Sequence, residues 1–251
     1  MLRPTSNATH TRAGHVARCD PGTRLEVIAQ IRQSLDGHDN DERTVVFWVN
    51  GPAGYGKSAL AQTIAECYTA EGHLLGSFFF LRGAGERSHI SCLIPTLAHQ
   101  ISLTVPGAKL LIESALEDEP ALPELSVSLA YQLQRLVIEP IHLDASHISY
   151  SSDGVSRSVK KQIVVIDALD ECDDKAQMAD FIDVLLSASS GRTHLPFWIL
   201  LTSRVEEHIQ KKFDSSEACF LHRLELQDFN ARLDIKVHFQ RAFDHIYDQN
   251  W

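Results

Sequence analysis

The chain has 251 residues, 44% of them hydrophobic and 22% charged, with a formal net charge of -10 at pH 7. This length and composition are typical of one α/β domain with tails and argue against two independent domains. The negative charge argues against a nucleic-acid partner or an anionic membrane surface, since either would require a basic face.

The first 18 residues contain few apolar side chains and no acids. Such a segment could be a transit peptide, but we favour a disordered leader over residues 1–18. No apolar run approaches the roughly 20 residues of a membrane-spanning helix, and no secretory signal is evident. The five cysteines lie far apart without a Cys-x-x-Cys pair, which indicates free thiols and no structural zinc. We therefore expect a cytoplasmic protein with no membrane span.

Apolar residues at helical spacing predict a helix over residues 25–35, after a turn at 19–24. A polar linker follows, and the β-branched and aromatic run at 45–49 predicts a buried strand. Helical spacing returns over residues 58–70. A strand and a helix thus flank a glycine-rich loop.

This loop fits the phosphate-binding pattern of four free positions between Gly51 and the run Gly56-Lys57-Ser58. Glycines let the backbone curl so that several N–H groups point at one polyphosphate, and the helix N-terminus adds its own. Lys57 would bridge the β- and γ-phosphates, and the Ser58 hydroxyl would ligate Mg²⁺. The residues expected to contact nucleotide are Gly51, Pro52, Ala53, Gly54, Tyr55, Gly56, Lys57, Ser58 and Ala59.

The run at 74–81 predicts a second strand, too apolar for a sheet edge unless it is covered on both faces. In the loop that follows, Arg82 or Arg87 could reach the γ-phosphate, although solvated surface arginines are the simpler interpretation. Helices are predicted over 90–104, 108–116 and 125–138, the last ending at Pro140. The polar stretch 144–158 predicts a mobile insertion.

Four apolar β-type residues, 163–166, predict a strand buried on both faces, and Asp167 follows where it should emerge. Asp167 would hold Mg²⁺ together with Ser58. Asp170 and Glu171 lie close enough in sequence to orient and deprotonate a water that attacks the γ-phosphorus. Of these two we favour Asp170, on the family resemblance given below.

Another buried strand is predicted over 197–203, and Arg204 follows it at the same sheet edge as Asp167. Its guanidinium could contact the γ-phosphate and report its loss, while a capping or salt-bridging role is equally compatible. A fifth strand over 218–226 and a closing helix within 227–251 complete the chain. Five strands joined mostly through helices predict a parallel doubly wound sheet, with the phosphates in the crevice between the two motif strands.

The two motifs together, the loop at 51–58 and the run Ile163-Val-Val-Ile-Asp-Ala-Leu-Asp-Glu-Cys172, resemble the NACHT domain. This domain belongs to the signal-transducing (STAND) P-loop ATPases, and the likeness is to its fungal NLR-like and nephrocystin-like branch. Three further features agree with this resemblance: the turn at 21–24, the triple phenylalanine at 78–80 and the run at 201–204. A small residue after the magnesium aspartate, here Ala168, with Asp170 two places beyond, separates NACHT from many other P-loop groups.

The resemblance covers residues 19–226 and implies a three-layer P-loop NTPase fold with sheet order 5-1-4-3-2. It implies a switch that binds ATP, or GTP in some members, with Mg²⁺, hydrolyses it slowly and drives homo-oligomerisation or contacts with other signalling proteins. The family continues into a winged-helix region, so a chain ending at Trp251 would be a truncated gene model or a stand-alone module.

A second interpretation is a non-hydrolysing interaction or oligomerisation module with structural nucleotide or none. A dedicated GTPase is less well supported, because no Asn/Thr-Lys-x-Asp segment that would read guanine occurs. Nothing in the sequence reads adenine either, so the choice of base stays open.

Overall fold

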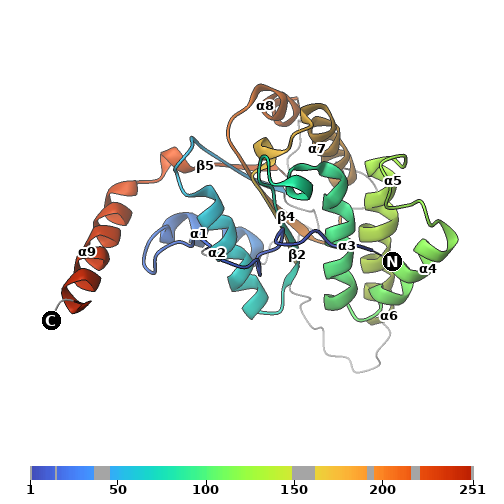
Figure 1. The fold of residues 1–251 in the computed structure, drawn as a ribbon, viewed down its shortest axis with the longest axis horizontal. Coiled ribbons are helices and arrows are strands. Elements are labelled where there is room, and N and C mark those ends of the chain that lie inside the picture. Colours follow the sequence, from blue (N-terminus) through green and yellow to red (C-terminus); the bar gives the residue numbers. More distant parts are fainter. Residues whose placement is uncertain are drawn as a thin grey trace.

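A parallel sheet of five strands forms the middle layer of the protein (Figure 1). The computed structural model describes residues 2–14, 16–36, 46–148, 162–190, 195–215 and 221–249. The strands are β1 Val46–Asn50, β2 Leu74–Phe79, β3 Ile163–Asp167, β4 Trp198–Ser203 and β5 Leu221–Glu225. Their order, β2-β3-β4-β1-β5, is the predicted 5-1-4-3-2 read from the other edge. The expected fold class is confirmed.

Helices cover both faces of this sheet. One face packs against α1 Leu25–Asp36 and α2 Lys57–Ala70. The opposite face packs against α3 Leu93–Thr104, α7 Lys175–Ser190 and α8 Glu207–Asp214. Outside α3 lie α4 Ala108–Asp118, α5 Leu129–Leu133 and α6 Glu139–Ile148, and short helical turns occupy Gly85–Ser88, Ile90–Cys92, Leu169–Glu171 and Leu226–Asp228.

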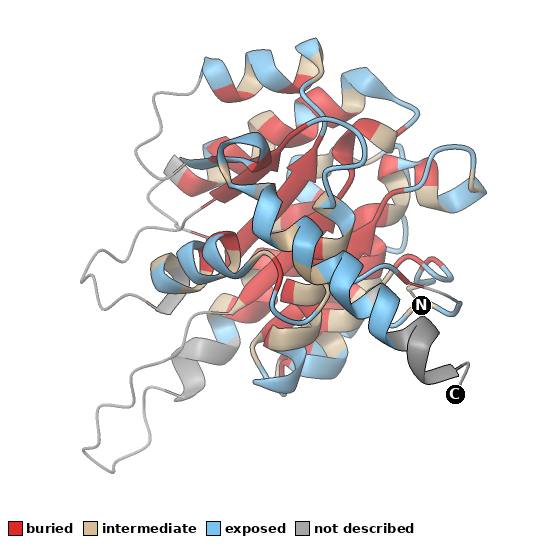
Figure 2. Cartoon of the chain, turned by 90° about the vertical axis from the view of Figure 1, so that its left-hand side faces the viewer, coloured by how far each residue is buried: buried red, intermediate tan, exposed pale blue. Residues whose placement is uncertain are grey.

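Side chains alternate between the two apolar layers, as the period of two in a strand requires. In β1, Phe47 joins the cluster beneath α1 and α2, and Trp48 joins the opposite cluster, where it stacks on Phe213 with ring centroids 4.4 Å apart. Every residue of β1 to β4 is buried (Figure 2), which explains why these strands are apolar without interruption.

The predicted end of a helix at Pro140 is wrong. Helical structure continues from α5 through a π-helical turn, Gln134–Ile138, directly into α6. Pro140 is the second residue of α6, and the wider π turn just before it changes the hydrogen-bond spacing where a proline has no N–H to donate. Residues 144–148 of the expected insertion belong to α6, while 149–158 lie outside the described residues.

The predicted disorder of the N-terminal leader is also wrong for the residues described. Residues 5–12, which we call the N-terminal strap, run along the free edge of β2. The Phe79 backbone N–H donates to the Ala8 carbonyl at 2.7 Å, the His10 N–H donates to the Ser77 hydroxyl at 2.9 Å, and Ala8 is fully buried. The strap therefore covers the edge strand whose apolar sequence required a cover.

The strap is also fixed to α2 through polar contacts. The Gln62 amide donates to the His10 carbonyl at 2.7 Å and accepts from the Arg12 guanidinium at 2.8 Å. These contacts use main-chain and amide groups, which a count of apolar residues does not reveal. This is why composition pointed to disorder for a segment that is anchored.

The strap gives the fold a predicted dependence on pH. The His10 ring lies between the Ser77 and Thr69 hydroxyls, at 2.9 and 3.1 Å, and burial lowers its pKa below 6.5, although Glu66 opposes this and Arg12 adds to it. Because the depressed pKa disfavours a charged ring in the folded state, the stabilisation is present above pH 6.5 and declines as the pH falls below it.

Denaturant unfolding of the wild type and His10→Gln, at about pH 7.5 and about pH 5.5, tests this dependence. We expect the loss of unfolding free energy on acidification to be smaller in the variant, because groups other than His10 titrate alike in both proteins. Equal losses would contradict the assignment.

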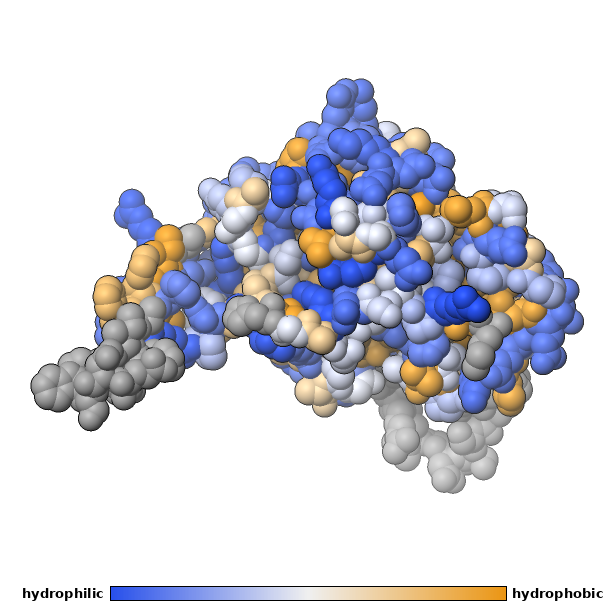
Figure 3. Space-filling model, viewed as in Figure 1, coloured by the Kyte–Doolittle hydropathy of each residue, from blue (hydrophilic) through white to orange (hydrophobic). Residues whose placement is uncertain are grey.

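The closing helix is α9, Ala231–Gln249, and it extends away from the sheet (Figure 1). Its exposed apolar residues gather at one end of the surface in Figure 3 and include Leu233, Ile235, Phe239 and Phe243. Within the described ranges, no helix combines the length and the apolar character required to cross a bilayer.

Candidate functional site

The loop after β1 turns through left-handed backbone at Gly54 and Gly56, with φ of 80° and 81°. A Cβ on either residue would meet nothing within 4 Å, so glycine is required here by conformation, and the space beside the loop is open. Gly56 is the N-cap of α2, and no side chain caps this helix. The N–H groups of its first turn therefore remain available to an anion.

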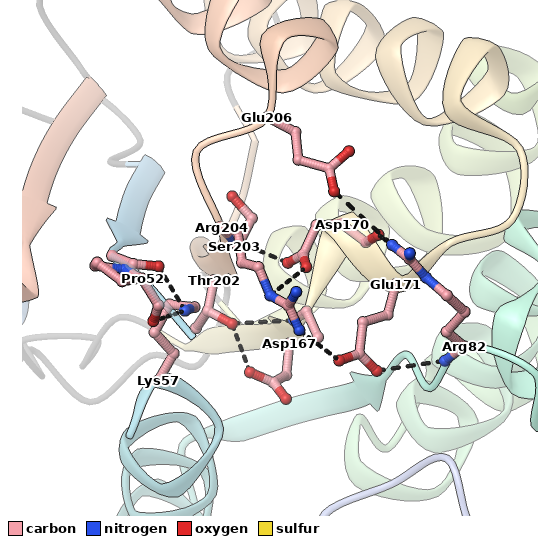
Figure 4. Close-up of polar contacts among 12 residues, drawn as sticks. Pro52, Lys57, Arg82, Asp167, Asp170, Glu171, Thr202, Ser203, Arg204 and Glu206 are labelled. Carbon is pink, nitrogen blue, oxygen red and sulfur yellow. Dashed lines mark hydrogen bonds and ion pairs between the residues drawn. The ribbon is translucent and has the colours of Figure 1, made fainter. Parts of the chain in front are cut away.

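Lys57 lies over the same loop (Figure 4). Its ammonium donates to the Gly51 carbonyl at 2.6 Å and to the Pro52 carbonyl at 2.8 Å. Burial lowers the pKa of Lys57, while the carboxylates of Asp170 and Asp167 oppose that shift. The loop thus holds a half-buried cation where the sequence expects a polyphosphate.

Asp167 ends β3 and is 3% exposed. Its carboxylate accepts from the Thr202 hydroxyl at 2.5 Å, and the Ser58 hydroxyl lies near enough to stabilise its charge. Burial raises the pKa of Asp167, and these two hydroxyls oppose the shift. The Thr202 hydroxyl also accepts from the backbone N–H of Ala168, whose left-handed φ of 59° turns the chain away from the strand.

Ser58 and Asp167, the two predicted metal ligands, are therefore neighbours. Hydroxyl and carboxylate oxygens are the ligands that Mg²⁺ prefers, and Mg²⁺ commonly takes one or two of them together with phosphate oxygens. The donor set and the open loop next to it fit a magnesium–polyphosphate group. The ion, when bound, would neutralise charge on the terminal phosphates.

Asp170 and Arg204, both predicted as site residues, contact each other. The Arg204 backbone N–H donates to Asp170 Oδ1 at 2.8 Å, and Arg204 Nε lies 3.3 Å from Oδ2 (Figure 4). Asp170 is 2% exposed, and its buried Oδ2 accepts no hydrogen bond. A buried acceptor without a hydrogen bond is unusual and marks a place for a donor such as water.

Glu171 is more open than Asp170, with a quarter of its side chain exposed. It accepts from the Arg82 backbone N–H at 3.3 Å and lies 4.0 Å from Arg204 Nη2. Arg82 itself donates to the Asp170 carbonyl at 2.5 Å and pairs with Glu206 at 3.8 Å, with 56% of its side chain exposed. These contacts fit the simpler interpretation of Arg82 as a surface arginine.

A cleft of about 1030 Å³ lies beside the loop. Residues 16–24 form one wall, Gly54 to Gly56 form the floor, and α9 supplies Ile235 and Phe239 on the far side. This is at the upper end of the size range of small-molecule sites, and the walls are largely apolar with a few polar groups.

Arg24 connects the three parts of this cleft, a role that the sequence did not reveal. Its guanidinium donates to the Tyr55 carbonyl at 2.8 Å and lies 3.5 Å from the Asp234 carboxylate, which also accepts from the Arg24 backbone N–H at 3.0 Å. Arg24 has a φ of 54°, and its buried Nη1 has no hydrogen-bond partner. Arg24 and Asp234 are 210 positions apart, so no local sequence pattern predicts that they pair.

Thr202 is a second site residue that the sequence analysis did not single out. A signal was present, because Ile166 pairs with Leu201 in register and the next residues, Asp167 and Thr202, are therefore neighbours on adjacent strands. The expected strand order already placed these strands side by side.

Among solved structures, the ADPNP–ADP complexes of the ORC2 protein from Aeropyrum pernix match at 13% identity with a TM-score of 0.47. That match covers 87% of this chain and 52% of the other, so this chain spans about half the length of the Aeropyrum protein. Drosophila ORC bound to DNA matches at 11% identity and a TM-score of 0.37, over 79% of this chain and 28% of the other.

No curated protein sequence matches the chain. Residues 25–204, well over half of its length, match the family described as Nephrocystin 3, N-terminal. The matched span contains the loop at 51–58, Asp167, Asp170 and Arg204. The chain therefore belongs to the Nephrocystin 3 N-terminal family and is a P-loop NTPase-like domain.

Proposed function

We propose that this chain is a NACHT-type switch of the STAND class that binds ATP or GTP with Mg²⁺ and hydrolyses it slowly in the cytoplasm. The observation that carries the proposal is the meeting of Lys57, Ser58 and Asp167 at one open, glycine-lined loop. Backbone N–H groups, a lysine and a hydroxyl–carboxylate pair are together the set that a magnesium-bound triphosphate requires.

In this proposal the phosphates lie on the loop, and the base lies in the adjoining cleft. The cleft begins where the loop ends, at Gly54 to Gly56, and its apolar walls suit an aromatic ring. Neither a guanine-reading nor an adenine-reading side chain stands out, so the proposal covers both nucleotides.

Asp170 is proposed to orient the attacking water. Its buried Oδ2 accepts no hydrogen bond, and the backbone N–H and the guanidinium of Arg204 hold the carboxylate in place. Glu171, more exposed, remains the second candidate for this role. Arg204 is proposed to bind the γ-phosphate when a triphosphate is present and to pair with Asp170 when that phosphate is absent.

Titration of the purified chain with ATP, GTP and ADP, with and without Mg²⁺, tests the binding step. We expect tighter binding of a triphosphate in the presence of Mg²⁺. Absence of binding for all three nucleotides would overturn the proposal.

Phosphate release from the wild type and Asp170→Asn tests the hydrolytic step. We expect a rate loss of roughly a hundredfold or more in the variant, since a positioned base contributes about that much. Equal background rates together with intact binding would favour the second candidate, a non-hydrolysing interaction or oligomerisation module.

A further inference from the structure

Two arginines from distant parts of the chain meet at Phe79, the last residue of β2. The Arg12 guanidinium lies 3.9 Å from the centroid of the Phe79 ring, and Arg87 Nε and Nη2 each lie 3.2 Å from the Phe79 carbonyl oxygen. Arg12 belongs to the N-terminal strap and Arg87 to the turn after β2. Both guanidiniums are partly buried, and burial lowers the pKa of each.

Neither guanidinium is neutralised by direct contact with an acid. Arg12 donates to the Thr9 carbonyl and the Gln62 amide oxygen, and Arg87 donates to a carbonyl. Across the described ranges, the ion pairs of the protein include neither arginine. Two positive charges without a direct ion-pair partner in the described ranges therefore lie at the end of β2.

Arg12 also has donors to spare. An arginine has five N–H donors, and both hydrogen bonds that Arg12 makes in the described part of the protein leave from Nη1. Its Nε and Nη2 make no hydrogen bond within the described ranges. These two atoms form an edge that can hold two oxygens of one phosphate in parallel.

Arg12 lies near the predicted magnesium ligands, Ser58 and Asp167. Phe79 pairs in register with Asp167 on the neighbouring strand, and strands in a sheet lie about 4.8 Å apart. On α2, Gln62, which anchors Arg12, follows Ser58 by four residues, so the two lie on the same side of the helix. Arg12 thus stands on the Ser58–Asp167 side of the sheet, and the Asp167 carboxylate is the main charge opposing the burial-induced fall in the pKa of Arg12.

We propose that Arg12, supported by Arg87, is a receptor for the terminal phosphoryl group of a nucleoside triphosphate and thereby couples nucleotide state to the N-terminal strap. This inference rests on the proposed function. A diphosphate lacks the group that Arg12 recognises. A triphosphate adds a charge-assisted contact to the strap while the Gln62 and Thr9 contacts stay in place. The strap is therefore held more firmly in the triphosphate state than in the diphosphate state.

The test compares Arg12→Ala and Arg12→Lys with Arg3→Ala, which removes the same charge from an exposed position just before the strap. Affinities for a non-hydrolysable ATP analogue and for ADP are measured with Mg²⁺. We expect Arg12→Ala to weaken the triphosphate analogue roughly tenfold to a hundredfold and ADP by less than about twofold. Arg12→Lys should recover part of the difference, and Arg3→Ala should behave as wild type.

A second readout follows the strap itself. Hydrogen exchange is measured at the Phe79 and His10 amides, which donate to Ala8 and Ser77. We expect the triphosphate analogue to slow this exchange relative to ADP in the wild type and not in Arg12→Ala. Equal weakening of both nucleotides, or no change in either readout, overturns the phosphate receptor while leaving the proposed function intact. A wild type that binds no nucleotide overturns both.

Discussion

Lys57→Ala is expected to abolish measurable binding of ATP and GTP. Lys57 is the only side chain among the described loop residues 51–58 that carries a positive charge, and it already stands over the loop within hydrogen-bonding distance of two carbonyls. Loss of its charge-assisted contacts to two phosphates should cost about 3 kcal/mol, which is more than roughly a hundredfold in affinity. Isothermal titration with each nucleotide measures this directly.

The fold should tolerate Lys57→Ala. The carbonyls that Lys57 contacts lie at a loop surface where water can replace it, so we expect a loss of about 1 kcal/mol or less in unfolding free energy. Lys109→Ala is a matched control, since Lys109 is an exposed lysine on α4 paired with Glu113. Unchanged affinity in a folded Lys57→Ala protein would mean that the loop does not hold phosphate.

Asp167→Asn is expected to remove the dependence of nucleotide binding on Mg²⁺. The amide keeps an oxygen that can accept from Thr202 and Ser58, but it lacks the charge that makes a carboxylate a strong ligand of a hard cation. We expect Mg²⁺ to improve triphosphate affinity by roughly tenfold or more in the wild type and by less than about twofold in the variant. Titrations with Mg²⁺ and with EDTA give both ratios.

The stability of the same variant provides an independent check. Burial raises the pKa of Asp167 above its ordinary value of 3.8, so the ionised carboxylate destabilises the metal-free fold at neutral pH. This penalty is relieved as the pH falls through the raised pKa. Without Mg²⁺, Asp167→Asn should therefore be at least as stable as the wild type at pH 7, whereas Asp118→Asn, at an exposed position of α4, should change little. A strongly destabilised Asp167→Asn would indicate a structural role for the charge.

Local patterns predicted most of the architecture because each depends on neighbours in sequence. The apolar runs of β1, β3 and β4 are buried on both faces, so they stand out as continuous stretches. The loop can be identified from Gly51, Gly54 and Gly56, because its backbone has the positive φ angles that favour glycine. The order of the strands depended on the family resemblance, since periodicity does not say which strands pair.

What local patterns missed depends on contacts between distant residues. Arg24 is indistinguishable from a surface arginine until Asp234 is brought beside it. The N-terminal strap was missed because main-chain hydrogen bonds anchor it, and these leave no trace in residue type. Asp170 and Arg204 were each identified, but their mutual pairing was not, because strand order does not say how the chain folds beyond the ends of β3 and β4.

The strap matters when a shorter fragment of this protein is produced. The family match begins at residue 25, and a fragment cut there would keep the loop at 51–58, Asp167, Asp170 and Arg204 but would lose the cleft wall at residues 16–24. It would also leave the Phe79 N–H and the Ser77 hydroxyl without their hydrogen bonds to the strap. The apolar edge strand β2 would then be exposed and could pair with the same edge of another molecule. Poor solubility of such a fragment would then reflect the exposed edge of β2.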